Sequence, residues 1–298
     1  MIENMATPQE NIEASPRVSE WRRFVRVFFN RPVVVFGFVV IMVFLLMAIF
    51  APFLAPYDPY ETSPYESLRQ PCWEHLLGTD LNGRDTLSRL IYGSRTSLVI
   101  GIVTVSIGAI VGMTVGLVAG YFGGWVNAIS MRVMDTIMAF PMILLALAIA
   151  AMLGGGLKNI IFALSIASLP INARVMHGQV LSVKEVDYVL AGHAIGASNM
   201  RIMLRHIVPN CFPPLIVLMT MSIGMVILAE AGLSFLGIGI EPPAAAWGAM
   251  VNEGYIFLLT NPVLSFAPGI AIMLIVLAFN MAGDGLRDAL DPRLRGII

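Results

Sequence analysis

The sequence has 298 residues, of which 57% are hydrophobic and only 12% are charged. A soluble domain carries about 25% charged residues, so this composition indicates that lipid is the solvent for most of the chain. The formal net charge of −1 provides no basic excess, which argues against nucleic acid as a partner.

The two cysteines and the four histidines show no recognisable ligand pattern. Cys72 and Cys211 lie far apart in sequence and in expected topology, so they support neither a disulfide framework nor a cysteine metal site. The histidines are His75, His177, His193 and His206. They lack the HExxH spacing and similar metal-binding patterns, so we assign no metal and expect polar loop or interface positions.

Residues 1–32 form a polar, arginine-rich tail that precedes the first apolar segment. We expect a first transmembrane helix in residues 33–55, whose uncharged run from 33 to 51 covers about 28 Å at about 1.5 Å per residue. That length matches the roughly 30 Å hydrocarbon core of a bilayer. A cleavable signal peptide is the alternative, but its apolar stretch of about 7–15 residues would be shorter.

Residues 56–94 are rich in prolines and turns, which argues against a membrane-spanning helix there. We expect an extracytoplasmic loop whose second half forms a short amphipathic helix after a turn at Gly78 to Gly83. Positive charge is unusual on that side, although long loops follow the positive-inside rule less strictly. The arginines concerned are Arg69, Arg84, Arg89 and Arg95.

Residues 95–284 are expected to form a core of five further helices. The uncharged stretch 96–131 is too long for one span, and the glycine-rich residues 120–124 provide a turn. The remaining spans are expected at 135–153, 159–173, 211–231 and 263–281. Pro170 should kink or end the span at 159–173. With the first helix, this predicts an all-α integral membrane protein of about six transmembrane helices.

Four glycines recur at every fourth position in the first span of this core. They are Gly108, Gly112, Gly116 and Gly120. Small residues at this spacing lie on one helix face and let a neighbouring helix approach closely. We therefore expect a helix-packing role for them rather than direct contact with a transported solute.

Charged residues place the segment 179–209 outside the bilayer. This segment and its flanks carry Arg174, Lys184, Asp187 and Arg201 among others. Each charge at the centre of a span would cost about 2.5–3.5 kcal/mol on insertion scales. With six spans, the segment lies on the same side as the tails 1–32 and 285–298. The positive-inside rule places all three, and so both termini, in the cytoplasm.

The sequence contains no nucleotide-binding loop of the Walker A type. Such a loop needs a Gly-Lys pair, whereas the two lysines, Lys158 and Lys184, follow Leu157 and Val183. Any ATP hydrolysis that drives this protein must therefore take place on another polypeptide.

Two acidic residues lie near the ends of predicted spans. Glu230 ends an apolar run, where it is either a gate or pore residue or a hydrated or paired residue at the helix end. Asp135 lies three residues after Arg132, and we expect these two side chains to anchor the helix end as a pair.

The segment 179–209 holds small residues between two polar flanks, and its centre reads KEVDYVLAGHAIGASNMRIMLRHIVPN. On physical grounds it is either a solvated loop or a short helix whose shallow surface docks into a groove of a partner.

This segment resembles the cytoplasmic signature of permease subunits in binding-protein-dependent ABC importers. The signature reads EAA, three residues, glycine, nine residues, then I-x-L-P. Ala191, Gly196 and Pro209 match it in register. The departures are Leu190 for glutamate, Gly192 for alanine, His206 for isoleucine and Val208 for leucine.

Further stretches resemble the C-type subunit of dipeptide and oligopeptide systems in particular. They are LAPYDP, HLLGTDLNGRDTLSRLIYGSRTSL, AGYFGGWVNAISMRVMD, LSFLGIGIEPPAAAWGAM and AFNMAGDGLRDALDPRLRG. The resemblance extends over most of the chain, from about residue 22 to residue 296.

The resemblance implies the MetI-like ABC importer permease fold with an extra N-terminal helix, in a bacterial inner or plasma membrane. It also implies a heterodimeric pore with a B-type permease, two ATPase subunits that bind ATP and magnesium, and an extracytoplasmic solute-binding protein. No catalytic residue or cofactor is expected on this chain. The residues implied to couple to the ATPases are Asp187, Tyr188, Ala191, Gly192, Gly196, Ala197, Ser198, Asn199 and Pro209.

The transported solute and two other function classes stay open at this point. Related permeases handle nickel, other metal chelates or glutathione in place of di- or oligopeptides. An ion-coupled secondary transporter usually has ionisable groups at the bilayer midplane, which are nearly absent here. An intramembrane enzyme needs a His/Asp/Glu cluster within its spans, which the sequence lacks.

Overall fold

The apolar segments of this chain fold as helices, because a helix pairs its own backbone N–H and C=O groups where lipid offers no partner. The computed structural model describes residues 20–290, in which β-structure is limited to one isolated bridge between Thr79 and Asp85. The N-terminal helices are α1 (Glu20–Phe29), α2 (Pro32–Ile49), α3 (Ala51–Leu54) and the 3-10 helix η1 (Pro64–Glu66). The longer core helices are α4 (Thr86–Phe122), α5 (Gly124–Met138), α6 (Met142–Leu153), α7 (Leu157–Val183), α10 (Val208–Phe235) and α12 (Val263–Leu290). The short elements between them are α8 (Asp187–Ala194), α9 (Asn199–Ile202), the π-helix η2 (Met203–Ile207) and α11 (Trp247–Tyr255).

Five helical stretches are long and apolar enough to cross a membrane. They are α2, α4, α7, the continuous stretch Asn199–Phe235 that includes α10, and α12. Helices α5 and α6 together form a sixth span if they are counted as one helix, broken where their axes bend by 87°. The predicted all-α membrane protein with about six spans is confirmed.

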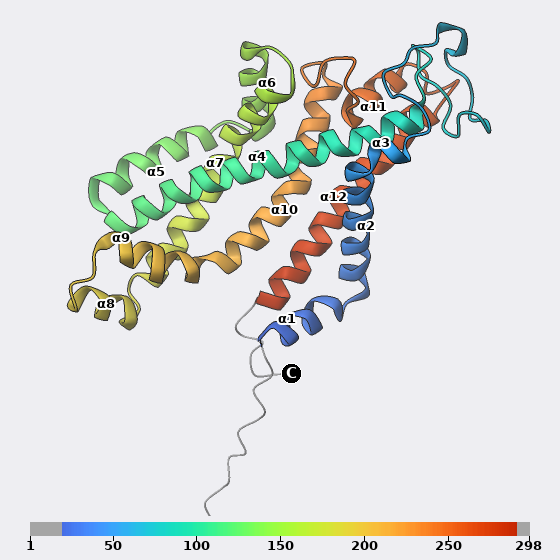
Figure 1. Ribbon diagram of the computed structural model, residues 1–298. Helices are drawn as coiled ribbons and strands as arrows, with labels where there is room; N and C mark the ends of the chain where they lie inside the picture. The colour runs from blue at the N-terminus through green and yellow to red at the C-terminus, as the bar shows by residue number, and fades with distance from the viewer. Residues whose placement is uncertain (1–19, 291–298) are drawn as a thin grey trace, which may run out of the picture.

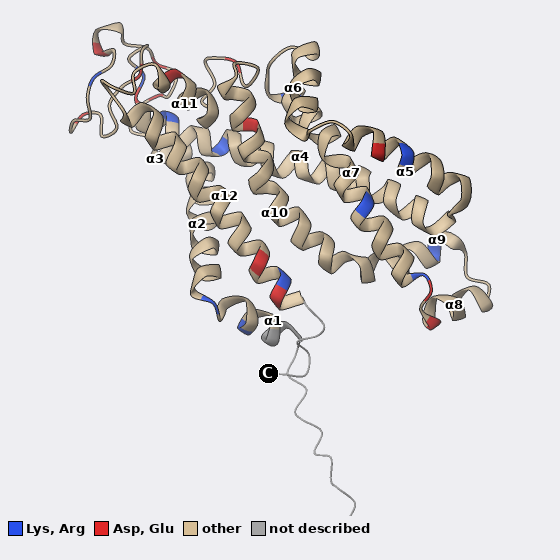
Figure 2. Ribbon diagram, turned by 180° about the vertical axis from the view of Figure 1, so that it is seen from behind, with Lys and Arg blue, Asp and Glu red and all other residues tan. Residues whose placement is uncertain are grey.

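The helices form an elongated bundle with two distinct ends (Figure 1). At one end, the segment 56–85 lies beside α11. At the other end, α1 lies beside the end of α12, and α8 and α9 lie beside the turn between α4 and α5. Figure 2 shows that many charged residues lie toward these ends, whereas long stretches of α2, α4, α10 and α12 carry none.

The amphipathic helix expected within residues 56–94 does not form as a separate element. Instead, α4 begins at Thr86, capped by Asp85, whose carboxylate accepts a hydrogen bond of 2.7 Å from the backbone N–H of Ser88. No proline interrupts the helix, which ends at Gly123 with a φ of 65°. At about 1.5 Å per residue α4 is about 55 Å long, well beyond the thickness of the hydrocarbon core.

Two other predicted spans have different limits in the structure. The span expected at 159–173 extends from Leu157 to Val183 and continues through the buried Pro170. Neighbouring helices can compensate for the hydrogen bond that a proline removes within the membrane, so Pro170 does not end the helix. The span expected at 135–153 is the bent pair of α5 and α6, and Pro141 lies at the bend as the N-cap of α6.

The four regularly spaced glycines of α4 lie against α7, its most extensive helix partner. A Cβ atom added to Gly112 would lie 2.6 Å from the carbonyl oxygen of Leu169, and one added to Gly120 would lie 2.9 Å from Val180 Cγ1. Added Cβ atoms at Gly108 and Gly116 would collide with Ser168 and Ala173 in the same way. These glycines therefore set the distance between the two helices.

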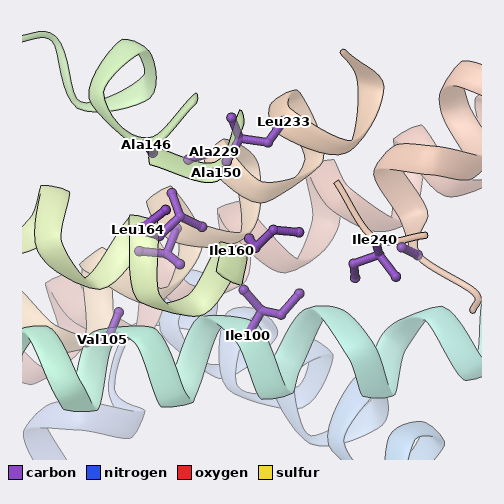
Figure 3. Packing of buried hydrophobic residues seen from close by; sticks show 12 residues of the cluster. Ile100, Val105, Ala146, Ala150, Ile160, Leu164, Ala229, Leu233 and Ile240 are labelled. Atoms are coloured by element: carbon purple, nitrogen blue, oxygen red, sulfur yellow. The ribbon is translucent and has the colours of Figure 1, made fainter. Parts of the chain in front are cut away.

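Apolar side chains from several helices complete the core around this pair. One buried cluster joins α4, α6, α7 and α10, and it includes Ile100, Ala150, Leu164 and Leu233 (Figure 3). Ile240, from the segment between α10 and α11, belongs to the same cluster. The core thus extends from the middle of the bundle to the end that holds α11.

We predict that Gly112→Ala destabilises the protein. The added methyl group would collide with the backbone of Leu169, which cannot rotate away, so the helices must separate. Overpacking of this kind costs about 1–3 kcal/mol. Thermal unfolding of the purified permease in detergent measures the change.

Gly178→Ala in α7 is the matched control. A Cβ atom at Gly178 has no neighbour within 4 Å, so the substitution adds no collision and should gain up to about 1 kcal/mol of helix propensity. Equal melting temperatures for the two variants would show that the α4–α7 distance tolerates a methyl group.

Candidate functional site

The segment from Lys184 to Pro209 folds into two short helices rather than a solvated loop. Val186 precedes α8, whose first residues are Asp187 and Tyr188. Helix α8 ends in a Schellman motif: the N–H of Gly196 donates to His193 at 3.0 Å, and the N–H of Ala197 donates to Gly192 at 3.1 Å. Gly196 has a φ of 76°, which side-chain-bearing residues rarely adopt. The backbone conformation therefore favours the glycine of the signature at this position.

The turn that follows leads into α9 and α10. The side chain of Ser198 caps α9 by accepting a 3.4 Å hydrogen bond from the backbone N–H of Arg201. The π-helix η2 then joins α9 to α10 in one continuous helical stretch, and Pro209 is the second residue of α10, directly after η2. No sequence pattern predicted this π-helix, an element that is often found at functional sites.

One face of this segment is anchored in the bundle. Val189 of α8 and Ile202 of α9 are fully buried, and they belong to a cluster with Leu117 of α4, Met176 of α7 and Leu215 of α10. Gly192 is buried against Ile202, which lies 3.8 Å from the position of an added Cβ. The small residue at this position lets α8 lie close to α9.

The end of α4 is bonded directly to the same segment. The hydroxyl group of Tyr121 donates a 2.9 Å hydrogen bond to Oδ1 of Asn199. The Tyr121 ring also stacks on His193 of α8, with 6.1 Å between centroids. Lys184 Nζ donates to the carbonyl of Gly120 at 3.4 Å. These contacts join α8 and its flanks directly to the end of α4.

The opposite face of the segment exposes apolar side chains. Ile195 is 84% exposed and Met200 is 61% exposed. Tyr188 and Leu190 are also exposed, as are Ala191 and Asn199. These exposed apolar residues, Tyr188, Leu190, Ile195 and Met200, are together called the α8–α9 apolar face, with Tyr188 and Leu190 on either side of the buried Val189. It lies among charged residues, at the end of the bundle where α4 turns into α5. It therefore has the character of a surface that a protein partner covers.

Glu230 is fully buried in α10, one turn before the end of the helix. Its Oε1 atom accepts a 2.6 Å hydrogen bond from Ser234 Oγ. Its Oε2 atom has no hydrogen-bond partner among the residues that the structure describes. Its expected gate or pore role stays a prediction.

The expected pairing of Asp135 with Arg132 is wrong. Asp135 forms an ion pair with Arg174 of α7, and both side chains are partly exposed. Because α5 and α7 pack side by side, a cation from the neighbouring helix reaches this carboxylate, a contact that local spacing does not reveal. Among the described residues, no three His, Cys, Asp or Glu side chains gather closely enough to hold a metal ion.

A buried charge cluster that sequence reasoning missed fastens the start of α4 to α11. It consists of Asp80, Arg84, Arg89 and Glu253, and we call it the arginine cluster. Arg89 is 1% exposed, is paired with Asp80, and reaches Glu253 Oε2 at 2.7 Å. Arg84 donates from Nε to Asp80 at 2.7 Å and from its terminal nitrogen to Glu253 at 3.2 Å. The sequence signal for this cluster was the alternation of acidic and basic residues in 80–89. No local pattern indicated the distant partner, Glu253.

Further bonds join the same two loop regions. Trp247 of α11 is fully buried, and its Nε1 atom donates a 2.9 Å hydrogen bond to the carbonyl of Leu90. Gln70 Nε2 donates to the carbonyl of Thr260 at 2.8 Å. The segment 56–94 and the segment 236–262 therefore form one structural unit at this end of the bundle.

Comparisons with known proteins agree with this architecture. Residues 112–296 match the family described as the binding-protein-dependent transport system inner membrane component. Residues 19–71 match the N-terminal TM domain of oligopeptide transport permease C. The inward-facing MetNI methionine ABC transporter shares the fold, with a TM-score of 0.56 at 20% identity, over 69% of this chain and 97% of that chain.

Two curated relatives match nearly the whole chain. The glutathione transport system permease protein GsiD of Escherichia coli O1:K1 / APEC is 44% identical over 277 residues, covering 93% of this chain and 90% of that protein. The dipeptide transport system permease protein DppC of Alkalihalophilus pseudofirmus is 41% identical over 292 residues, covering 98% and 95%.

The spanning helices, together with a short helical segment anchored at one end of the bundle, define a multi-pass membrane protein of the permease type. The chain belongs to the family of binding-protein-dependent transport system inner membrane components. It is thus the permease subunit of an ABC importer, a non-catalytic component of the inner membrane that works with an ATPase and a binding protein.

We predict that Arg89→Gln destabilises the end of the bundle that holds α11. Removal of one partner from a buried ion-pair cluster costs about 3–5 kcal/mol, because the remaining charges stay buried. Arg69→Gln is the control, since Arg69 pairs with Glu66 and Glu74 at an exposed position, where such pairs contribute less than about 1 kcal/mol. Thermal unfolding and limited proteolysis within residues 56–85 measure the difference, and equal behaviour of the two variants would contradict the role of the cluster.

Proposed function

We propose that this chain forms one half of a heterodimeric pore that imports short peptides, with a B-type permease as the other half. Two partner ATPases bind ATP and magnesium, and an extracytoplasmic solute-binding protein delivers the peptide. The names of the relatives support this class of solute, because glutathione and dipeptides are both short peptides with charged ends.

The α8–α9 apolar face is the observation that carries the proposal. Its inner side is fixed by buried Val189 and Ile202, while its outer side presents Ile195 to the surroundings. A short helix that is held firmly on one side and apolar on the other suits insertion into a groove of a partner protein. We propose that the ATPase provides this groove, which makes residues 179–209 the coupling segment.

The arrangement of the two bundle ends supports one orientation in the membrane. We place the tails 1–32 and 285–298 and the coupling segment 179–209 in the cytoplasm. Residues 33–55 then form the first span, 56–94 the outer loop and 95–284 the permease core. Helix α1, the end of α12 and the coupling segment lie toward the same end of the bundle, opposite the segment 56–85 (Figure 1).

Transport follows from differential binding to two conformations of the pore. ATP binding closes the ATPases and shifts the coupling segments that rest on them. The bond between Tyr121 and Asn199 and the buried cluster around Val189 carry this shift to α4, α7 and α10. Hydrolysis and product release return the pore to its first conformation.

We predict that Gly196→Trp uncouples ATP hydrolysis from uptake. The left-handed backbone conformation costs a side-chain-bearing residue about 1–2 kcal/mol, and the indole ring would also alter the docking surface. Uptake by the reconstituted complex should fall about tenfold, which corresponds to about 1.4 kcal/mol, while ATP hydrolysis and membrane insertion persist. Parallel assays of peptide uptake and phosphate release on the same vesicles measure the coupling.

Gly196→Asn is the matched control, because asparagine tolerates the left-handed conformation and is found at helix C-termini. This variant should retain most of the uptake. Normal uptake by Gly196→Trp, or equal loss in both variants, would count against a docking role that depends on this turn.

We also predict which solutes stimulate the complete complex. With its binding protein present, dipeptides, oligopeptides or glutathione should raise ATP hydrolysis by the complex, whereas free amino acids should not. If nickel chelates alone stimulated ATP hydrolysis, the transported solute would be a nickel chelate and not a peptide. Uptake that persists without ATP and stops when the proton gradient collapses would instead indicate a secondary transporter.

A further inference from the structure

Four arginines near the end of the bundle that holds α11 conflict with the expected charge distribution, and the structure accounts for three of them. Arg84 and Arg89 belong to the buried arginine cluster, and Arg69 pairs with Glu66 and Glu74. The fourth, Arg95 in α4, is exposed and takes part in none of the ion pairs found within residues 20–290. Its charge therefore has no partner within the described part of the chain.

Arg95 lies at a groove between α2 and α4. The groove has a volume of about 330 Å³. Its other lining residues are all apolar: Leu45, Ala48 and Ile49 from α2, and Leu98, Val99, Ile102 and Val103 from α4. Figure 1 shows α2 beside α4 near α3, where the two helices are in contact. The groove thus combines a long apolar surface with a single positive charge.

The position of the groove along α2 places the charge near a membrane surface. Helix α2 has 18 residues, so it covers about 27 Å, close to the thickness of the hydrocarbon core. The groove contains Ile49, the last residue of α2, while Leu45 lies one turn deeper. Arg95 lines the same short stretch, from which its long side chain can extend to the headgroup layer.

We propose that this groove binds an anionic phospholipid. One acyl chain lies along Leu45, Leu98 and Ile102, and the phosphodiester oxygens accept hydrogen bonds from the guanidinium group of Arg95. Arginine binds phosphate with two parallel hydrogen bonds, which gives geometric specificity as well as attraction. An anionic headgroup supplies the negatively charged partner that Arg95 lacks. A zwitterionic headgroup already carries a cation beside its phosphate, so it gains less binding free energy from Arg95.

A second groove on the bundle provides an internal contrast. It has a volume of about 390 Å³ and lies along α12, and its lining residues are Leu258, Ser265, Phe266, Gly269, Ile270 and Met273. None of these residues is charged. A lipid chain in this second groove should therefore show no preference for headgroup charge, so selectivity for anionic lipid is specific to the groove that contains Arg95.

The test is native mass spectrometry of the purified transporter complex, titrated with phosphatidylglycerol or with phosphatidylcholine. The wild-type complex should bind one phosphatidylglycerol per copy of this chain more tightly than phosphatidylcholine. Arg95→Gln should weaken phosphatidylglycerol binding about tenfold, as expected for the loss of hydrogen bonds to a charged group, and leave phosphatidylcholine binding unchanged. Ile102→Trp keeps the charge but fills the groove, so it should weaken the binding of both lipids.

Arg132→Gln is the matched control, because Arg132 is also exposed and forms no ion pair in the described part of the chain, but lies in α5 outside the groove. It should bind both lipids as the wild type does. Equal loss in Arg95→Gln and Arg132→Gln would overturn the proposal, as would equal affinity of the wild type for both lipids. Disulfide formation between Ile102→Cys and a cysteine introduced into a partner permease of the assembled complex would show that a protein helix, not lipid, fills the groove, and would overturn the proposal.

Discussion

The close approach of α4 and α7 is the constraint on which the rest of the structure depends. Helices in lipid gain little from the hydrophobic effect when they associate, so their association relies on close packing and on small residues at the contact. The glycines from Gly108 to Gly120 bring the backbone of α4 against the backbone of α7. Helices α6 and α10 then pack on this pair through one buried cluster, and α8 and α9 pack on it through another.

Helix α4 also connects the two ends of the bundle as a single element. It begins at the arginine cluster, where Arg89 contacts Glu253, and it ends at Tyr121, which bonds to Asn199 of α9. Between these points the glycines bring α4 so close to α7 that an added Cβ at Gly112 would lie 2.6 Å from the carbonyl oxygen of Leu169. Helices α8 and α9 therefore contact a closely packed pair of helices rather than α4 alone.

The features that local sequence spacing determines were predicted well. The glycine repeat predicted a packing face on α4, and in the structure that face lies against α7. The placement of 179–209 outside the bilayer, which rested on charge, stays a prediction. Contacts between distant residues were not predictable in the same way. The start of α4 was predicted near residue 96, because hydropathy rises there. In the structure the helix begins at Thr86, after a cap. This start is held by the arginine cluster, in which Glu253 lies 164 residues from Arg89 in sequence. Asp135 was assigned to the nearest arginine, but the packing of α5 on α7 brings Arg174 to it instead. The family signature marked a glycine at position 196, but its left-handed conformation became visible only in the structure.

Exposed apolar side chains have two different meanings in this protein, and their position decides between them. Along α2 and α4, residues such as Phe36 and Ile110 are exposed within spans that lipid surrounds, so their exposure costs nothing. Ile195 is even more exposed, but it lies in a segment that also carries Lys184, Asp187 and Arg201, and these charges cannot enter the hydrocarbon core. Lipid therefore cannot cover Ile195, and water around so large an apolar side chain is unfavourable. We propose that contact with another protein covers it, which gives a physical reason to place the partner that supplies energy at this end of the bundle.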